Sequence, residues 1–160
     1  MQFRLAERKD INQLIQMRWD FTVDDKEIKK SIKYNFESFR MECQAFLENA
    51  LKNETWFIWV AEEEAKIISH IYIQLISKVP RPGRITYPFA YMTNVYTIQK
   101  YRNQGIGSKL ITTINEWAKN NNYEFIIVWP SEDSGDYYKR NGYVLCKEPM
   151  EFFPSKIEYK

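Results

Sequence analysis

The strongest constraint on the fold lies in residues 85–129, where two apolar runs flank a pair of glycines and an amphipathic stretch. The run ITYPFAYMTNVYT (85–97) is rich in β-branched and aromatic residues, and FIIVW (125–129) is typical of a buried strand. Between them four apolar residues recur at helical spacing: Ile106, Leu110, Ile114 and Trp117. A strand, a helix and a second strand in this order predict a crossover unit, in which a helix packs against a sheet.

The rest of the chain supplies further elements around this unit. Strands are expected at 3–5, 56–61 and 66–76, and late strands at 143–145 and 151–153. Helical patterns cover 11–19 and 28–50, where the second could be one helix or two, and a short helix is expected within 130–142. The predicted order is β α α β β β α β α β β. At 160 residues, without repeats or linkers, we expect a single domain spanning 1–160.

Composition excludes several classes of function. With 23 basic and 21 acidic residues the net charge is only +2, which provides no basic face for nucleic acid. One histidine and two cysteines cannot assemble a His/Cys zinc site, so no metal is expected. The first residues lack the apolar core of a signal peptide, and no apolar run approaches the ~20 residues of a membrane span. We therefore expect a cytoplasmic protein that does not bind membranes.

The segment YRNQGIGSKL (101–110) raises the question of which anion it could hold. A P-loop requires G-x-x-x-x-G-K-S/T, but here the serine precedes the lysine and the first glycine is missing. A Rossmann fingerprint requires a third glycine where Leu110 stands. What remains is R-x-x-G-x-G at the start of a helix, where Gly105 and Gly107 let backbone N–H groups approach a pyrophosphate closely.

A second segment, SGDYYKRNGY (134–143), follows the run at 125–129. Together the two segments resemble the GNAT superfamily of N-acetyltransferases, which carries Q/R-x-x-G-x-G/A after its fourth strand and small-x-x-F/Y-Y-x-x-x-G-F/Y after its fifth. The matching residues are Arg102, Gly105, Gly107, Ser134, Tyr137, Tyr138, Gly142 and Tyr143. The order of elements also matches along nearly the whole chain. One departure is Ser131, where many members have asparagine.

The resemblance implies an α/β (α+β) fold: a central mixed, mostly antiparallel sheet of six or seven strands, with splayed fourth and fifth strands and about four flanking helices. It implies N-acetyltransferase activity, in which a primary amine of a small molecule attacks acetyl-CoA directly in a ternary complex. A homodimer is a further expectation. The residues expected to contact the cosubstrate are Asn94, Val95, Tyr96, Thr97, Arg102, Asn103, Gln104, Gly105, Ile106, Gly107, Ser108, Ser131, Ser134 and Tyr137.

The resemblance assigns the general acid to Tyr138, whose phenol would protonate the departing thiolate. For the base that deprotonates the amine, Glu132 is favoured because it follows the fifth strand, and Asp20, Asp24 and His70 are alternatives. A structural role fits His70 better than a catalytic one, and a direct base need not exist. Two other functions stay open: a protein or peptide N-acetyltransferase, and a CoA-binding regulatory module without turnover. The acceptor, the acyl-chain preference and the oligomeric state are not determined by the sequence.

Overall fold

The computed structural model describes residues 1–24 and 35–154, and the chain divides into two compact units, Met1–Trp129 and Pro130–Lys160. In the described residues, the first unit contains a five-stranded sheet and the helices α1 (Ile11–Asp24), α3 (Phe36–Ala50) and α4 (Ile106–Asn120). None of the helices in these residues is long and apolar enough to cross a membrane.

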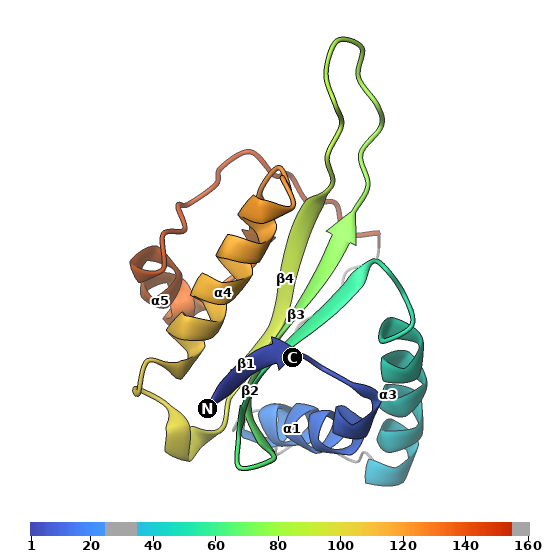
Figure 1. Ribbon diagram of the computed structural model, residues 1–160, viewed down its shortest axis with the longest axis vertical. Helices are drawn as coiled ribbons and strands as arrows, with labels where there is room; N and C mark the ends of the chain where they lie inside the picture. Colours follow the sequence, from blue (N-terminus) through green and yellow to red (C-terminus); the bar gives the residue numbers. More distant parts are fainter. Residues whose placement is uncertain (25–34, 155–160) are drawn as a thin grey trace. The chain divides into compact units, whose positions relative to one another are not determined.

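The sheet is mixed and mostly antiparallel, as the resemblance implied. Its strands follow the chain order, so each strand lies beside the next one in sequence: β1 (Gln2–Leu5), β2 (Trp56–Glu63), β3 (Lys66–Ile76), β4 (Phe89–Thr97) and β5 (Ile126–Val128). The first four are antiparallel, and β5 is parallel to β4 because α4 carries the chain back between them. Beyond the sheet, a long loop between β3 and β4 projects away from it (Figure 1).

Helices cover both faces of this sheet (Figure 1). On one face α1 and α3 bury Leu14, Ile15 and Leu47 against β2 and β3, and on the other Ile106 of α4 packs on Ala61 and Ile68. Asn35 caps α3 by accepting a 2.8 Å hydrogen bond from the backbone N–H of Glu37. The earlier part of the second helical pattern, at 28–34, lies outside the described residues.

A cluster of charges, here called the ion cluster, joins the beginning of the first unit to β2. Arg4 donates to both oxygens of Asp10, at 2.7 and 3.0 Å, and from Nε to Glu62 at 2.7 Å. Asp10 also accepts a 2.7 Å bond from the backbone N–H of Glu7, which closes a capping box before α1. Asp10 is 2% exposed, so this carboxylate is paired from two directions inside the protein.

The second unit begins with a 3-10 turn at Glu132–Ser134 and the short helix α5 (Gly135–Arg140). The late strands expected at 143–145 and 151–153 do not form: the structure assigns no strand to either stretch. Val144 is 89% exposed and Leu145 75% exposed. Strand propensity describes how a side chain fits a half-buried sheet, so it does not order a segment that lacks this packing. The described sheet therefore has five strands, not six or seven.

Candidate functional site

The middle of β4 is where the sheet opens. β5 pairs with β4 only from Ala90 to Met92, so in the described part of the chain no strand pairs with residues 93–97 on that side. We call residues Thr93–Thr97 the open half of β4. Within it the pairing with β3 also shifts: Tyr72 faces Thr93, whereas His70 faces Tyr96. Three steps along β4 thus oppose two along β3, which is a β-bulge.

Asn94 forms the bulge with φ of 49°, in the left-handed region that asparagine tolerates better than most residues. After Asn94, successive residues of β4 again direct their backbone N–H and C=O groups alternately toward β3 and toward the opposite edge. Ile98 donates its N–H to the carbonyl of Ile68 at 3.0 Å, and the carbonyl of Tyr96 accepts from Ser69 Oγ at 3.0 Å. Because alternate residues of a strand face the same neighbour, the N–H and C=O groups of Val95 and Thr97 point toward the opposite edge.

Three side chains hold Asn94 from the face of the sheet that α1 covers. His70 donates from Nδ1 to the carbonyl of Asn94 at 2.9 Å, and Arg18 of α1 donates to its side-chain oxygen at 3.2 Å. The phenol of Tyr72 also hydrogen-bonds to the side chain of Asn94. We call these four residues the Asn94 cluster.

His70 lies inside this cluster and is fully buried. Its ring lies 5.1 Å from that of Tyr72 and 5.8 Å from that of Tyr96, measured between centroids. Burial, together with the nearby charge of Arg18, lowers the pKa of His70 to about 4 despite the bond to Asn94. A buried, neutral imidazole cannot take a proton from an amine in solution, so the geometry favours the structural role over the catalytic one.

After β4, the glycine segment runs into α4 through two left-handed residues, Asn103 (φ 61°) and Gly105 (φ 76°). Gly105 is the N-cap of α4, so no side chain caps the first turn, and that turn contains no acidic residue. Its backbone N–H groups therefore stay available at the positive end of the helix dipole. The change from left-handed to helical backbone at this point also forms a concave arrangement of N–H groups that suits an anion.

Arg102 links this loop to the end of β4. Its side chain donates from Nε to the carbonyl of Thr97 at 2.9 Å, and its guanidinium lies 5.5 Å from the centre of the Tyr96 ring. The open half of β4 and the segment Arg102–Ser108 are thus one continuous structure in the first unit. All eleven predicted contact residues between Asn94 and Ser108 lie in these two stretches.

The other predicted residues lie in the second unit. Ser131 and Ser134 hydrogen-bond through their hydroxyls at 2.9 Å. The rings of Tyr137 and Tyr138 lie 5.2 Å apart, and burial raises the pKa of each to about 12. Glu132 opens the 3-10 turn with an exposed side chain.

The turn after α5 explains the spacing of the second motif. The N–H of Tyr143 donates to the carbonyl of Tyr138 at 3.1 Å, and that of Gly142 donates to Lys139 at 3.1 Å. This is a Schellman motif, which needs a left-handed residue, and Gly142 supplies it with φ of 89°. The ring of Tyr143 then lies 5.8 Å from that of Tyr138, as the apolar contact of such a turn requires.

Sequence reasoning did not identify Arg18. Its contact with Asn94 spans 76 positions, and a lone arginine on an amphipathic helix is normally a solvated charge. Its guanidinium also lies 5.4 Å from the centre of the Phe21 ring, and Phe21 stacks on Tyr96. Of the alternative bases on α1, Asp20 is exposed and accepts a 2.8 Å bond from Gln16, and Asp24 is the last residue of the helix.

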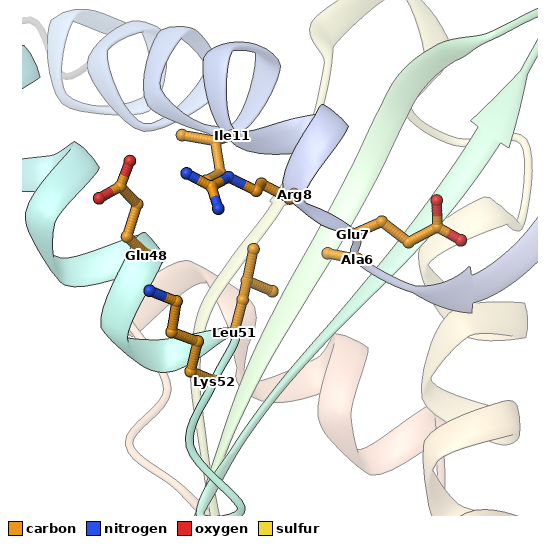
Figure 2. Close-up of a pocket in the computed structure, with 7 residues that line it drawn as sticks. All are labelled: Ala6, Glu7, Arg8, Ile11, Glu48, Leu51 and Lys52. Atoms are coloured by element: carbon orange, nitrogen blue, oxygen red, sulfur yellow. The ribbon is translucent and has the colours of Figure 1, made fainter.

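A small pocket of about 140 Å³ lies elsewhere in the first unit. It is formed where the segment before α1 meets the end of α3, with Arg8 and Glu7 on one side and Glu48 and Lys52 on the other (Figure 2). None of the predicted site residues line it. Within residues 1–24 and 35–154, no group of three or more His, Cys, Asp or Glu side chains is placed to hold a metal ion.

Comparisons with known proteins identify the family. The model of the acetyltransferase (GNAT) family matches residues 11–143. A search of curated protein sequences found no match. Among solved structures, a predicted acetyltransferase from Clostridium acetobutylicum, determined with acetyl-CoA, is 28% identical, with 95% of each chain covered and a TM-score of 0.75.

Two more distant structures share the fold. Glucosamine-6-phosphate N-acetyltransferase from Arabidopsis thaliana is 18% identical, with 96% of this chain and 98% of that chain covered and a TM-score of 0.69. An aminoglycoside 6'-N-acetyltransferase from Acinetobacter haemolyticus is 16% identical, with 99% and 100% covered and a TM-score of 0.69. With a family match over most of its length, this chain belongs to the GNAT family of acetyltransferases.

Proposed function

We propose that this protein transfers the acetyl group of acetyl-CoA to a primary amine of a small molecule, by direct attack in a ternary complex. One observation carries the proposal: the open half of β4, which no strand in the described residues covers on that side, is joined by one short loop to an uncapped helix N-terminus. Such a surface offers strand-like hydrogen bonds to an extended amide chain and N–H donors to a diphosphate. Coenzyme A contains both groups in that order.

The diphosphate would bind the backbone N–H groups between Asn103 and Ser108. Gly105 favours this role because its left-handed backbone turns the chain into the helix without adding a side chain above the N–H groups. The absence of acidic residues in the first turn of α4 also removes the usual competitors for those donors. Gln104 and Ile106 would contribute through their main chain.

The pantetheine arm would extend along the open half of β4, where it would act as a further strand. Val95 directs its main-chain groups toward that edge, as does the N–H of Thr97, whose carbonyl already accepts from Arg102. Of the two N–H groups expected to polarise the thioester carbonyl, that of Val95 faces the open edge, whereas that of Tyr96 faces β3. From the second unit, Ser131 and Ser134 would offer hydroxyl groups to the arm's amides, and Tyr137 an aromatic surface.

Tyr138 would carry a proton to the departing sulfur. In the reaction the amine loses a proton and the thiolate gains one, so the exchange is balanced without an added acid. Burial raises the pKa of Tyr138 to about 12, which keeps the phenol protonated at neutral pH. Because such a phenol is a weaker acid than a thiol with a pKa of about 8.5, it must regain its proton from the acetylated nitrogen for the transfer to proceed.

We propose a single domain over 1–160 and a small-molecule acceptor. Two proteins that share the fold are named for small amine acceptors, which supports this choice of acceptor. Glu132 is the proposed base, and its exposed carboxylate would take the first proton, the one that converts the ammonium to the free amine, to solvent. The second proton, lost from the nitrogen during acetyl transfer, would restore the phenol of Tyr138. A homodimer and a cytoplasmic location remain predictions.

Thiol release from acetyl-CoA with a panel of amines tests the proposal, together with calorimetric titration of CoA. Tyr138→Phe should lower kcat about a hundredfold and change the Kd for CoA by less than about twofold, because only the proton donor is lost. Tyr123→Phe is the matched control, since its ring packs on Trp117 at the far end of α4 and should leave kcat unchanged.

The outcomes separate the alternatives. Acetylation of peptides but not of free amines would favour the protein acetyltransferase. Tight CoA binding without turnover on any acceptor would favour the regulatory module. No detectable CoA binding by the folded protein would refute the whole proposal.

A further inference from the structure

We propose that His70 is a positioning residue, whose Nδ1–H holds the carbonyl of Asn94 and thereby keeps the β4 bulge in the shape that presents its amides to the thioester. This inference rests on the function proposed above. It concerns a residue on β3 that is fully buried, so a substrate could not contact its side chain from solvent.

The bulge creates the need for such a donor. At the register shift, the regular exchange of hydrogen bonds between β3 and β4 is interrupted, and the left-handed backbone at Asn94 turns its carbonyl out of the ladder. A buried carbonyl without a partner is costly, so a side chain has to replace the lost ladder donor. His70 does so at 2.9 Å.

The hydrogen bond also determines the tautomer of His70. A carbonyl oxygen only accepts, so Nδ1 must carry the hydrogen and Nε2 must be a lone-pair acceptor. Nε2 is buried and has no hydrogen-bond partner among the described residues. One nitrogen of the ring is therefore used and the other costs stability.

That imbalance argues against simple packing. A leucine would fill a similar volume between the rings of Tyr72 and Tyr96 without a buried unsatisfied atom. What histidine adds over leucine is one N–H directed at Asn94. A general base is also excluded by geometry, because both nitrogens lie inside the protein and one already donates a hydrogen.

The charges around His70 keep it in this state. From α1 the guanidinium of Arg18 approaches the same asparagine, and β3 and β4 contribute the neutral phenols of Tyr72 and Tyr96. Among residues 1–24 and 35–154, no carboxylate contributes to the shift in the pKa of His70, and Arg18 opposes a second positive charge. The imidazole should therefore remain a neutral Nδ1–H donor throughout the pH range of catalysis.

The first test measures the tautomer directly in the wild-type protein. Long-range nitrogen–proton correlation spectra of histidine, which is present once in the chain, report which nitrogen is protonated. We expect a protonated Nδ1 and a bare Nε2 from pH 5.5 to 8. An Nε2–H tautomer or an imidazolium at neutral pH would overturn the inference, whatever the activity of the protein.

The second test compares two substitutions. His70→Leu removes the donor, whereas in His70→Asn the amide Nδ2 stands close to the position of Nδ1 and keeps an N–H toward Asn94. Loss of the donor should lower kcat between about ten- and a hundredfold with little change in the KM for acetyl-CoA, because only the placement of the reacting carbonyl changes. His70→Asn should recover most of that loss.

Ile67→Val is the matched control, since it trims another fully buried side chain of β3 that does not contact Asn94. It should lower stability slightly and leave kcat unchanged. Equal kcat values for His70→Leu and wild type, or a His70→Asn variant no better than His70→Leu, would refute the positioning role. If His70→Leu does not fold, the tautomer measurement decides alone.

These results are distinguishable from failure of the proposed function. Wild-type protein that neither binds CoA nor releases thiol would refute the function, whereas the Nδ1–H tautomer would still be found. Wild-type turnover together with unaffected His70 variants would refute only the role of His70.

Discussion

The ion cluster and the Asn94 cluster are both buried and polar, but they differ in how completely their hydrogen bonds are satisfied. In the ion cluster, Arg4 pairs with two carboxylates, and Asp10 receives a further backbone N–H. In the Asn94 cluster, His70 leaves Nε2 without a partner among the described residues, and Asn94 itself has a left-handed backbone. The first arrangement suits a role in stability. The second costs stability and lies where the sheet opens, as expected of a functional site.

The largest expected effect comes from removing the cation of the ion cluster. Arg4→Leu would leave two carboxylates without their partner, one of them Asp10 at 2% exposure. Loss of one member of a buried pair typically costs about 3–5 kcal/mol, so the free energy of unfolding in urea should fall by that amount.

Arg40→Leu is the control for this substitution, because Arg40 pairs with Glu37 on the surface of α3. It should lower the free energy of unfolding far less than Arg4→Leu, because solvent screens an exposed pair. Equal losses for the two variants would remove the distinction between the ion cluster and an ordinary surface pair.

The second effect is a pH dependence that separates the two clusters. Burial lowers the pKa of His70 to about 4, from an ordinary value near 6.5. As the pH falls below 6.5, the unfolded chain takes up a proton at His70 that the folded protein does not, so stability decreases down to about pH 4. The full decrease is on the order of 3 kcal/mol.

In the ion cluster, the carboxylate of Asp10 affects stability at a lower pH than His70 does. Burial opposes ionisation of Asp10, but hydrogen bonds from Arg4 and from the N–H of Glu7 outweigh it and hold its pKa below the usual value. Its contribution is complete above about pH 4 and is lost below. Urea unfolding from pH 7 to 3 should therefore show two declines, and His70→Leu should abolish only the upper one. An unchanged upper decline in that variant would assign it to other groups.

A smaller effect is expected in the loop that follows the open half of β4. Gly105→Ala should cost about 1–2 kcal/mol, because alanine is strained at φ of 76°. It should also weaken CoA binding, measured by calorimetry, since the strained loop would relax away from the diphosphate.

Gly135→Ala sharpens this test because it makes the same chemical change in ordinary backbone. Gly135 has φ of −55° and open space around its Cβ position. The substitution should raise stability by about 0.4–1 kcal/mol. If both alanines behaved alike, backbone conformation would not be the reason for the glycine at 105.

Local sequence patterns predicted the elements of the first unit well. The predicted crossover unit is present as β4, α4 and β5. Pro88 stands immediately before β4, because proline has no backbone N–H to donate within a sheet. The strand expected at 56–61 extends two residues further, to Glu63, and the turn after it is formed by Glu64 and Ala65. Arg4 explains the difference, because it pairs with Glu62 and makes an acidic residue favourable inside the strand.

These local patterns could not predict contacts between residues that are far apart in the sequence. Nothing in the neighbourhood of Asn94 indicates a bulge, since the asparagine follows a regular strand pattern and its partners are far away in the chain. His70 looked like one of several polar residues on β3, and only the fold shows that it meets Asn94. The late strands expected at 143–145 and 151–153 were wrongly predicted for a related reason. Their residues favour a strand, but a strand forms only where another strand lies beside it, and local sequence does not show this.

The glycine at 142 shows that a signature sequence can mix two kinds of information. Tyr138 contributes the hydroxyl that we propose carries a proton, whereas Gly142 contributes a backbone angle, through which Tyr143 reaches the ring of Tyr138. A protein engineer who varied only side chains near a substrate would never sample position 142. Yet any side chain there would strain the left-handed backbone, although the space around the Cβ position is open, and would loosen the contact that Tyr143 makes with the Tyr138 ring. The orientation of Tyr138 therefore depends on a residue four positions after it.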